Sequence, residues 1–295
     1  WVRIDRRQGV FLMLAGAISS GLSQARQLSR ETLHAVDGRS IQVDIWRPSG
    51  KVIGRIHFSH GAASSPWKYS RLLEPLCDLG YEIWAPLHVD STEHPLTTQF
   101  KGMASWAARL QDMHALSLTI DSRYIAMGHS YGALISLTLG GARPSAPIEL
   151  AGQLRDLRVS AVVALSPPGP ITGFVDSAAY SSLDVPALIQ TGDRDIPLGL
   201  AGARWQDHLV AYDAASANGS RYALVLEGVD HYFGSAICRP ELPVPPQLSM
   251  LLSTVEIIEL FLAAHASGDG STALTARSEL GERLASEGAV RLTRK

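Results

Sequence analysis

Apolar and polar residues alternate over residues 31–50, "ETLHAVDGRSIQVDIWRPSG", on both sides of Asp37-Gly38. An Asp-Gly pair between two alternating runs is typical of a β-hairpin, because glycine readily takes the positive φ that a tight turn requires. The following segment, "VIGRIHFSHG" (residues 52–61), is a short apolar strand that leads into a His-Gly turn. The pattern therefore predicts two antiparallel strands and then a buried one.

From residue 69 onward, apolar strands alternate with helices. The apolar residues of "YSRLLEPLCDLG" (69–80) have the spacing of an amphipathic helix that ends at Gly80. The same reasoning predicts further helices at 103–120 and 247–264. It predicts further strands at 81–88, 124–130, 159–168, 186–195 and 221–233.

This alternation predicts an α/β fold. Apolar strands separated by helices indicate a mostly parallel central sheet, here of about eight strands, covered by helices on both faces. Reactive side chains in such sheets gather at the carboxyl ends of the strands. No repeat or linker interrupts residues 30–266. We therefore predict one domain over that range, with residues 267–295 as a C-terminal tail.

The beginning of the chain, residues 1–25, has the layout of a signal peptide. Three arginines precede the apolar run "VFLMLAGAIS" (10–19), and the small residues Ser23 and Ala25 follow it. The pattern predicts a secreted or periplasmic protein, and the alternative is a cytoplasmic protein with a structural N-terminal helix. The run is about half the roughly 20 residues that cross a bilayer, so we expect no stable membrane insertion.

Composition excludes several classes of partner. Hydrophobic residues make up 46% of the 295 residues, charged residues make up 18%, and the formal net charge is -2. Such a chain can form a core, and it lacks the basic surface that nucleic acids bind. Cys77 and Cys238 have no metal-ligand spacing. We expect no metal and no cofactor, and the two cysteines could be either a disulfide or two buried thiols.

The strongest chemical signal is the segment "YIAMGHSYGALISLTLGG" (124–141), in which Gly128, Ser130 and Gly132 form a G-x-S-x-G pattern. A predicted strand precedes this pattern and a predicted helix follows it. In that context the turn exposes the serine hydroxyl, and the small flanking residues let strand and helix approach each other. We predict that Ser130 is a nucleophile, and the alternative is a structural serine in a turn.

A serine hydroxyl needs a base, and the base needs a carboxylate that holds its tautomer. Two later strands supply them at their carboxyl ends, namely Asp195 in "PALIQTGDRD" and His231 in "RYALVLEGVDHYF". Asp193 is the alternative acid, whereas Asp230 is expected to be a loop residue. The predicted catalytic residues are therefore Ser130, Asp195 and His231.

Acyl transfer also requires hydrogen-bond donors for the developing oxyanion, usually two main-chain N-H groups. The residue after the nucleophile, Tyr131, is expected to supply one of them. The turn after the strand "VIGRIHFSHG" is expected to supply the other from Ala62.

We expect four side chains near the substrate: Trp67, His88, Tyr232 and Phe233. The alternative for the aromatic residues is ordinary core packing. His94 lies in the same loop as His88, and for both histidines the alternative to a substrate contact is an ordinary surface position. Fewer than twenty residues separate the strand that ends near residue 167 from the next one at residue 186. That length is too short for a helical cap domain, so an open site is expected.

The segments "FSHGAASSPWKYSRLLEPLCDLGYEIWAPLHVDS", "GHSYG", "GDRD" and "DHYFG" together resemble the serine α/β-hydrolases. Among these, the chain is most similar to the esterases related to dienelactone hydrolase and to platelet-activating-factor acetylhydrolase. The resemblance implies the α/β-hydrolase fold, the triad named above, and Ala62 and Tyr131 as oxyanion donors. Dienelactone hydrolases proper use a cysteine nucleophile, so Ser130 favours ester hydrolysis instead.

The predicted activity is therefore that of a serine carboxylic-ester hydrolase that forms an acyl-enzyme, with polyesters among its substrates. A thioesterase or a lipase-like phospholipid acyl hydrolase would use the same residues and is the alternative. A non-catalytic hydrolase-like binding protein is the remote alternative, since all three triad members are present.

Overall fold

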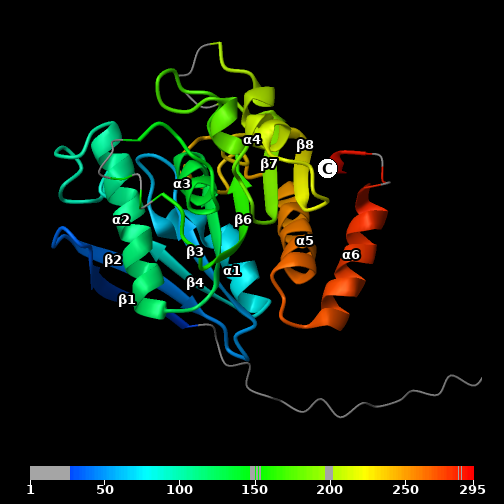
Figure 1. Ribbon diagram of the computed structural model, residues 1–295, viewed down its shortest axis with the longest axis horizontal. Helices are drawn as coiled ribbons and strands as arrows, with labels where there is room; N and C mark the ends of the chain where they lie inside the picture. Colours follow the sequence, from blue (N-terminus) through cyan, green and yellow to red (C-terminus); the bar gives the residue numbers. More distant parts are fainter. Residues whose placement is uncertain are drawn as a thin grey trace, which may run out of the picture.

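A mixed sheet of nine strands forms the centre of the computed structural model (Figure 1). The structure describes residues 27–146, 154–196, 202–284 and 288–295, together with residues 150, 152 and 286. The expected signal peptide, residues 1–25, lies outside the described residues. The strand order is β1-β2-β4-β3-β5-β6-β7-β8-β9. The strands are β1 Gln27–His34, β2 Ser40–Arg47, β3 Gly54–Ser59, β4 Tyr81–Pro86, β5 Tyr124–His129, β6 Val159–Leu165, β7 Ala187–Arg194, β8 Arg221–Asp230 and β9 Val290–Arg294.

Six neighbouring strands of this sheet run parallel to one another, in the order β4, β3, β5, β6, β7 and β8. The hairpin β1-β2 is antiparallel, β2 pairs antiparallel with β4, and β9 pairs antiparallel with β8. The mostly parallel α/β sheet predicted from the sequence is confirmed. Because the central strands are parallel, the segments that follow β3, β5, β7 and β8 all leave the sheet at the same edge.

Helices cover both faces of the sheet (Figure 1). Helices α1 and α5 pack on one face, and α2 and α3 pack on the other. The helices are α1 Ser70–Asp78, α2 Met103–Ile120, α3 Tyr131–Leu139, α4 Val210–Ala214, α5 Leu248–His265 and α6 Gly270–Leu284, with short 3-10 helices η1 Pro66–Tyr69, η3 Ser177–Tyr180 and η4 Trp205–Leu209.

Strand β5 shows why the sequence forms this sheet. All six of its residues are buried, and the first four alternate between the two cores. Ile125 and Met127 pack toward α1 and α5, whereas Tyr124 and Ala126 pack toward α2 and α3. Successive side chains of a strand point to opposite faces, so a strand with helices on both sides is mostly apolar.

Helix α5 is long and apolar enough to cross a membrane by length and composition alone, with a mean hydropathy of 1.6. Leu251, Ile258 and Phe261 on this helix are buried in the core beside the sheet. One side of α5 therefore forms part of the core, whereas Leu248 and Leu252 on the same helix are exposed.

Residues 267–295, expected as a tail, extend the fold beyond the predicted boundary at residue 266. Helix α6 packs against α5, and β9 adds a ninth strand beside β8. Only Ala276 and Leu280 of α6 are buried, so its apolar periodicity is weak. Strand β9 is five residues long and carries two arginines. Neither element therefore stands out in the sequence.

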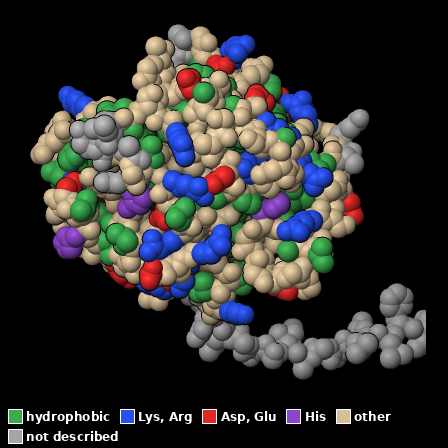
Figure 2. Space-filling model, viewed as in Figure 1, with side chains coloured by type: hydrophobic (Ala, Val, Ile, Leu, Met, Phe, Trp, Pro, Cys, Tyr) green, Lys and Arg blue, Asp and Glu red, His purple; other side chains and the backbone are tan. Residues whose placement is uncertain are grey.

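The connection between β6 and β7 contains one 3-10 turn, η3, and no cap domain among its described residues. Cys77 and Cys238 are both buried as free thiols, so the disulfide alternative is not the one the structure adopts. Acidic and basic side chains are interspersed on the face drawn in Figure 2, in keeping with the small net charge.

Candidate active site

Ser130 lies in the turn between β5 and α3. Its backbone has φ 55° and ψ -120°, a conformation that a residue with a side chain adopts only at a cost of about 1–3 kcal/mol. The next residue, Tyr131, begins α3. The turn therefore places the Ser130 hydroxyl at the carboxyl edge of the sheet. A nucleophilic serine in the predicted strand-turn-helix context is expected at this position.

The two glycines of the turn permit a close approach of three backbone segments. A Cβ added to Gly128 would lie 2.2 Å from the carbonyl oxygen of Gly132, inside any allowed contact. A Cβ added to Gly132 would lie 1.9 Å from the carbonyl oxygen of Ser59, at the end of β3. Glycine at both positions thus lets the start of α3 pack directly against the end of β3.

The structure brings Ser130, His231 and Asp195 together in one hydrogen-bonded series. The Ser130 Oγ lies 3.0 Å from His231 Nε2, and His231 Nδ1 lies 2.6 Å from Asp195 Oδ1. A carboxylate can only accept, so His231 carries its proton on Nδ1. Nε2 is then free to accept the proton of the serine hydroxyl, as nucleophilic catalysis requires.

Asp195 is fully buried, and all partners of its carboxylate are hydrogen-bond donors. Thr191 Oγ1 donates to Asp195 Oδ2 over 2.8 Å, and His231 donates to Oδ1. Burial by itself would raise the pKa of this carboxyl, but hydrogen bonds from His208 and His231 hold its pKa well below the usual range. The carboxylate therefore stays ionised and orients His231.

The two competing carboxylates have other partners. Asp193, the alternative acid, accepts a hydrogen bond from the main-chain N-H of Gly228 over 2.7 Å. Asp230 accepts from the N-H groups of Tyr232 and Gly234, both over 2.9 Å. Asp230 is thus more than the solvated loop residue expected, because it stabilises the loop that carries His231.

The expected oxyanion donors, the N-H groups of Ala62 and Tyr131, lie in the segments that Gly132 brings together. Within the described part of the chain, neither N-H has a main-chain or side-chain acceptor. Two N-H groups without a partner at this place are what a developing oxyanion would bind.

A chain of hydrogen bonds links Gly61, next to Ala62, to the loop that carries His231. The N-H of Gly61 donates to the Tyr69 hydroxyl over 2.9 Å, and that hydroxyl lies 2.9 Å from His129 Nδ1. His129 Nε2 in turn donates to the main-chain oxygen of His231 over 2.8 Å. Burial, with a smaller effect of His231, lowers the pKa of His129 to about 3. His129 is therefore neutral and has a structural role beneath the nucleophile.

Comparison with known proteins gives a consistent result for the fold. No protein-family model matches the sequence, and no curated protein matches it. Among solved structures, an α/β serine hydrolase homologue from Coxiella burnetii has a TM-score of 0.54 at 16% identity, covering 78% of this chain and 95% of its own. An esterase from Pyrococcus furiosus has a TM-score of 0.54 at 14% identity, covering 81% and 93%. The chain has the α/β-hydrolase fold.

Proteins with the α/β-hydrolase fold differ in the bonds they cleave. A puromycin-hydrolysing peptidase from Mycobacterium tuberculosis has a TM-score of 0.57 at 12% identity, covering 83% of this chain and 40% of its own. Similarity at this level shows the fold alone, so the reaction must be argued from the site.

One histidine at the site was not anticipated from the sequence. His208, in η4, places Nε2 3.1 Å from Asp195 Oδ1 and Nδ1 2.6 Å from the carbonyl oxygen of Pro167. Both ring nitrogens therefore face acceptors. Burial opposes the charged ring, but the hydrogen bond and charge of Asp195, with the carbonyl contacts, raise the pKa of His208. The surrounding sequence, "WQDHL", carries no signal of this role.

Asp195, His208 and His231 also have ligand atoms within 4.8 Å of one another, as metal ligands do. The contact of 2.6 Å between Asp195 Oδ1 and His231 Nδ1 is shorter than the roughly 3.3 Å between two ligands of a tetrahedral metal ion. The three side chains are hydrogen-bonded directly, which accounts for their proximity.

Two of the four expected substrate contacts need correction. His88 is buried and hydrogen-bonds to Ser59 and Asp112, and Phe233 is buried in the core near α5. Neither presents a surface to a substrate, because apolar packing and the need for hydrogen-bond partners draw both inward. Trp67 is 36% exposed, and Tyr232 is half-buried with its ring 5.0 Å from that of His231. These two remain candidates.

Proposed function

We propose that the chain is a serine hydrolase that cleaves carboxylic esters through an acyl-enzyme. The observation that carries the proposal is the continuous series from Ser130 Oγ through His231 to the buried carboxylate of Asp195. A structural serine in a turn would not need a histidine on its hydroxyl or a carboxylate behind that histidine. The similarity in fold to esterases and other hydrolases supports the same class.

In the first half of the reaction, His231 Nε2 takes the proton of Ser130 while Oγ attacks the ester carbonyl carbon. The carbonyl oxygen gains negative charge and accepts hydrogen bonds from the N-H groups of Ala62 and Tyr131. The imidazolium is stabilised by Asp195, and it then donates its proton to the departing alkoxide. The product alcohol leaves, and Ser130 carries the acyl group.

The second half repeats these steps with water as the nucleophile. His231 Nε2 takes a proton from water, the resulting hydroxide attacks the acyl carbon, and the same donors hold the oxyanion. When the tetrahedral intermediate collapses, the proton returns from His231 to Ser130 Oγ, and the carboxylic acid is released.

We extend the proposal to accessible esters, including the chain ends of polyesters. No cap domain lies between β6 and β7 in the described residues, so these strands place no helical cover above Ser130. Trp67, exposed in η1, offers an apolar surface for an acyl or aromatic group.

An ester panel tests this function. The purified protein is expected to hydrolyse p-nitrophenyl acetate and butyrate faster than the palmitate, and Ser130→Ala is expected to lose at least about 10³-fold in kcat. Aminoacyl p-nitroanilides and a polyester film in the same panel distinguish amide and polymer cleavage.

The competing carboxylates supply a matched control. Asp195→Asn is expected to lower kcat by about 10⁴-fold, because the amide would favour the wrong tautomer of His231. Asp193→Asn is expected to stay within about 10-fold, since this carboxylate contacts a main-chain N-H instead. The proposal fails if the wild-type protein turns over no ester, or if Ser130→Ala remains fully active.

A further inference from the structure

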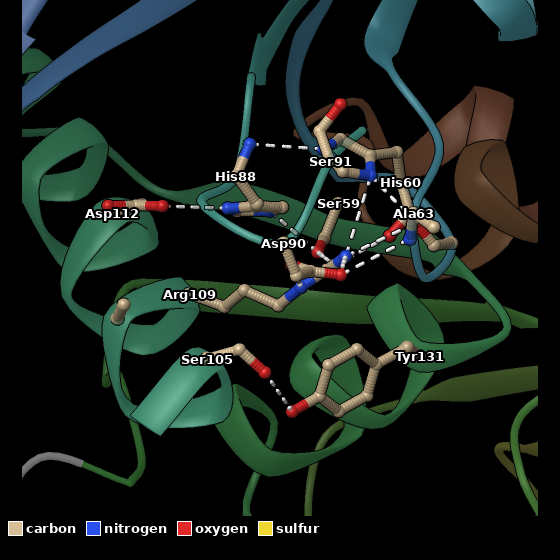
Figure 3. Close-up of polar contacts among 12 residues, drawn as sticks. Ser59, His60, Ala63, His88, Asp90, Ser91, Ser105, Arg109, Asp112 and Tyr131 are labelled. Atoms are coloured by element: carbon tan, nitrogen blue, oxygen red, sulfur yellow. Dashed lines mark hydrogen bonds and ion pairs between the residues drawn. The ribbon is translucent and has the colours of Figure 1, made fainter. Parts of the chain in front are cut away.

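Arg109 of α2 has a fully buried side chain that reaches the loop carrying His60 and Ala63 (Figure 3). Its guanidinium forms a two-point ion pair with Asp90, with Nε 2.7 Å from Oδ1 and Nη2 2.9 Å from Oδ2. Burial would raise the pKa of Asp90, but Arg109 holds it well below the usual range. The pair is therefore ionised on both sides and carries almost no net charge.

The same guanidinium holds the main chain at residues 60 and 61. Nη1 donates to the carbonyl oxygen of His60 over 2.6 Å, and Nη2 donates to that of Gly61 over 3.2 Å. The Gly61 carbonyl belongs to the same peptide unit as the Ala62 N-H. In a trans peptide the C=O and the N-H point in opposite directions, so fixing the oxygen also fixes the direction of the N-H.

The partner of Arg109 holds the next peptide unit, which joins Ala62 to Ala63. Asp90 Oδ2 accepts a hydrogen bond from the N-H of Ala63 over 3.3 Å. Ala63 has φ 57°, which an alanine adopts only when its surroundings require it. The ion pair thus fixes the residues before and after Ala62, and leaves the Ala62 N-H free to bind an oxyanion.

Arg109 also contacts the second donor residue. Its guanidinium carbon lies 4.6 Å from the centre of the Tyr131 ring, and the Tyr131 hydroxyl lies 3.2 Å from Ser105 Oγ on the same helix α2 (Figure 3). The ring of Tyr131 is therefore held against α2. Because Tyr131 carries the other oxyanion N-H, one buried side chain contacts both donor segments.

We propose that Arg109, paired with Asp90, is a positioning residue of the oxyanion hole: it fixes the Gly61-Ala62 peptide relative to Tyr131, so that both N-H groups converge on one oxygen. This inference rests on the proposed function. The role requires arginine, because only a planar group with five donors can contact two carboxylate oxygens, two carbonyls and an aromatic face together.

The test replaces Arg109 by lysine, which keeps the charge and loses the fork of donors. Arg109→Lys is expected to lower kcat by about 10- to 100-fold with KM changed by no more than about 2-fold, because misplaced donors weaken only the transition state. The affinity for a trifluoromethyl ketone, whose adduct with Ser130 carries an oxyanion, should fall by a factor similar to that for kcat/KM.

Arg221→Lys is the matched control. Arg221 is equally buried and donates to a main-chain carbonyl, that of Leu183 over 2.6 Å, but it lies at the start of β8, at the opposite edge of the sheet from Ser130. We expect it to lower the melting temperature and to leave kcat and the ketone affinity unchanged.

If Arg109→Lys does not fold, Asp90→Asn tests the same pair, with an expected loss of about 3- to 10-fold in kcat and in ketone affinity. The inference is overturned if a folded variant keeps the wild-type kcat, or if kcat falls while ketone affinity does not. Inactivity of the wild-type protein would instead overturn the proposed function.

Discussion

At the scale of single residues, the site depends on side chains whose partners come from distant parts of the chain. Asp195 lies two residues from Asp193 in the sequence, yet only Asp195 reaches His231. The strand β7 ends between these carboxylates, and the change of direction there turns them to different partners. His208 then adds a second imidazole on Asp195.

The raised pKa of His208 predicts a pH-dependent contribution to stability. A histidine whose pKa is raised by folding stabilises the native state fully below its unfolded pKa of about 6.5, and this stabilisation is lost as the pH rises through the higher folded value. His208→Gln should therefore reduce the free energy of unfolding more at pH 5 than at pH 8.5. The loss at pH 5 should exceed the loss at pH 8.5 by about 1.4 kcal/mol for each unit by which folding raises the pKa of His208.

Urea unfolding of both proteins at the two pH values measures this difference. His34→Gln, on the exposed strand β1, controls for the loss of an imidazole and should change stability by less than about 0.5 kcal/mol at either pH. A loss for His208→Gln that is constant or grows with pH would show that His208 is not a cationic partner of Asp195.

At the scale of elements, the sequence predicts strands and helices well where burial is complete. Strand β5 is apolar from Tyr124 to Gly128 because both of its faces are covered, and α5 is apolar along the side that packs in the core. Helix α6 is covered on one narrow stripe only, and β9 pairs along one edge of the sheet. Elements with so few buried positions leave little pattern in a sequence.

Two leucines of α6 test whether this helix is a packed part of the fold. Leu280 is fully buried and Leu274 is 68% exposed. Leu280→Ala should lower the free energy of unfolding by about 2–4 kcal/mol, because it leaves a cavity between α6 and the core. Leu274→Ala should change it by less than about 0.5 kcal/mol. Equal effects of the two substitutions in denaturant titrations would indicate that α6 is a loose tail.

At the scale of the whole molecule, several buried histidines determine the response to acid. Burial lowers the pKa of His57 and of His129 to about 3, and it lowers the pKa values of His60 and His88 well below normal. Burial also lowers the pKa of His265 to about 4, so near pH 5 the unfolded chain binds more protons at these histidines than the folded protein does. Burial raises the pKa of Asp112 to about 7, which offsets part of this difference.

The free energy of unfolding should thus rise with pH between about 4 and 6.5. Each proton that is taken up on unfolding contributes about 1.4 kcal/mol per pH unit to this slope near pH 5. Urea titrations at half-unit steps of pH measure the slope. His57→Phe should reduce this slope by about 1.4 kcal/mol per pH unit, because it removes one titrating group. The substitution is mild, since His57 stacks on Tyr124 and its ring nitrogens have no hydrogen-bond partner in the described residues. A flat profile would contradict these assignments.

Three features could be predicted from neighbouring residues in the chain: the alternation of strands and helices, the glycine-flanked turn at Ser130, and the order of Ser130, Asp195 and His231. These follow from local periodicity and local backbone geometry. Other features become visible in the folded protein alone: which carboxylate lies beside His231, the burial of His88 and Phe233, and the positions of Arg109 and His208 against the site. Those outcomes depend on how side chains from distant segments point into a shared space, for which a single sequence contains no direct signal.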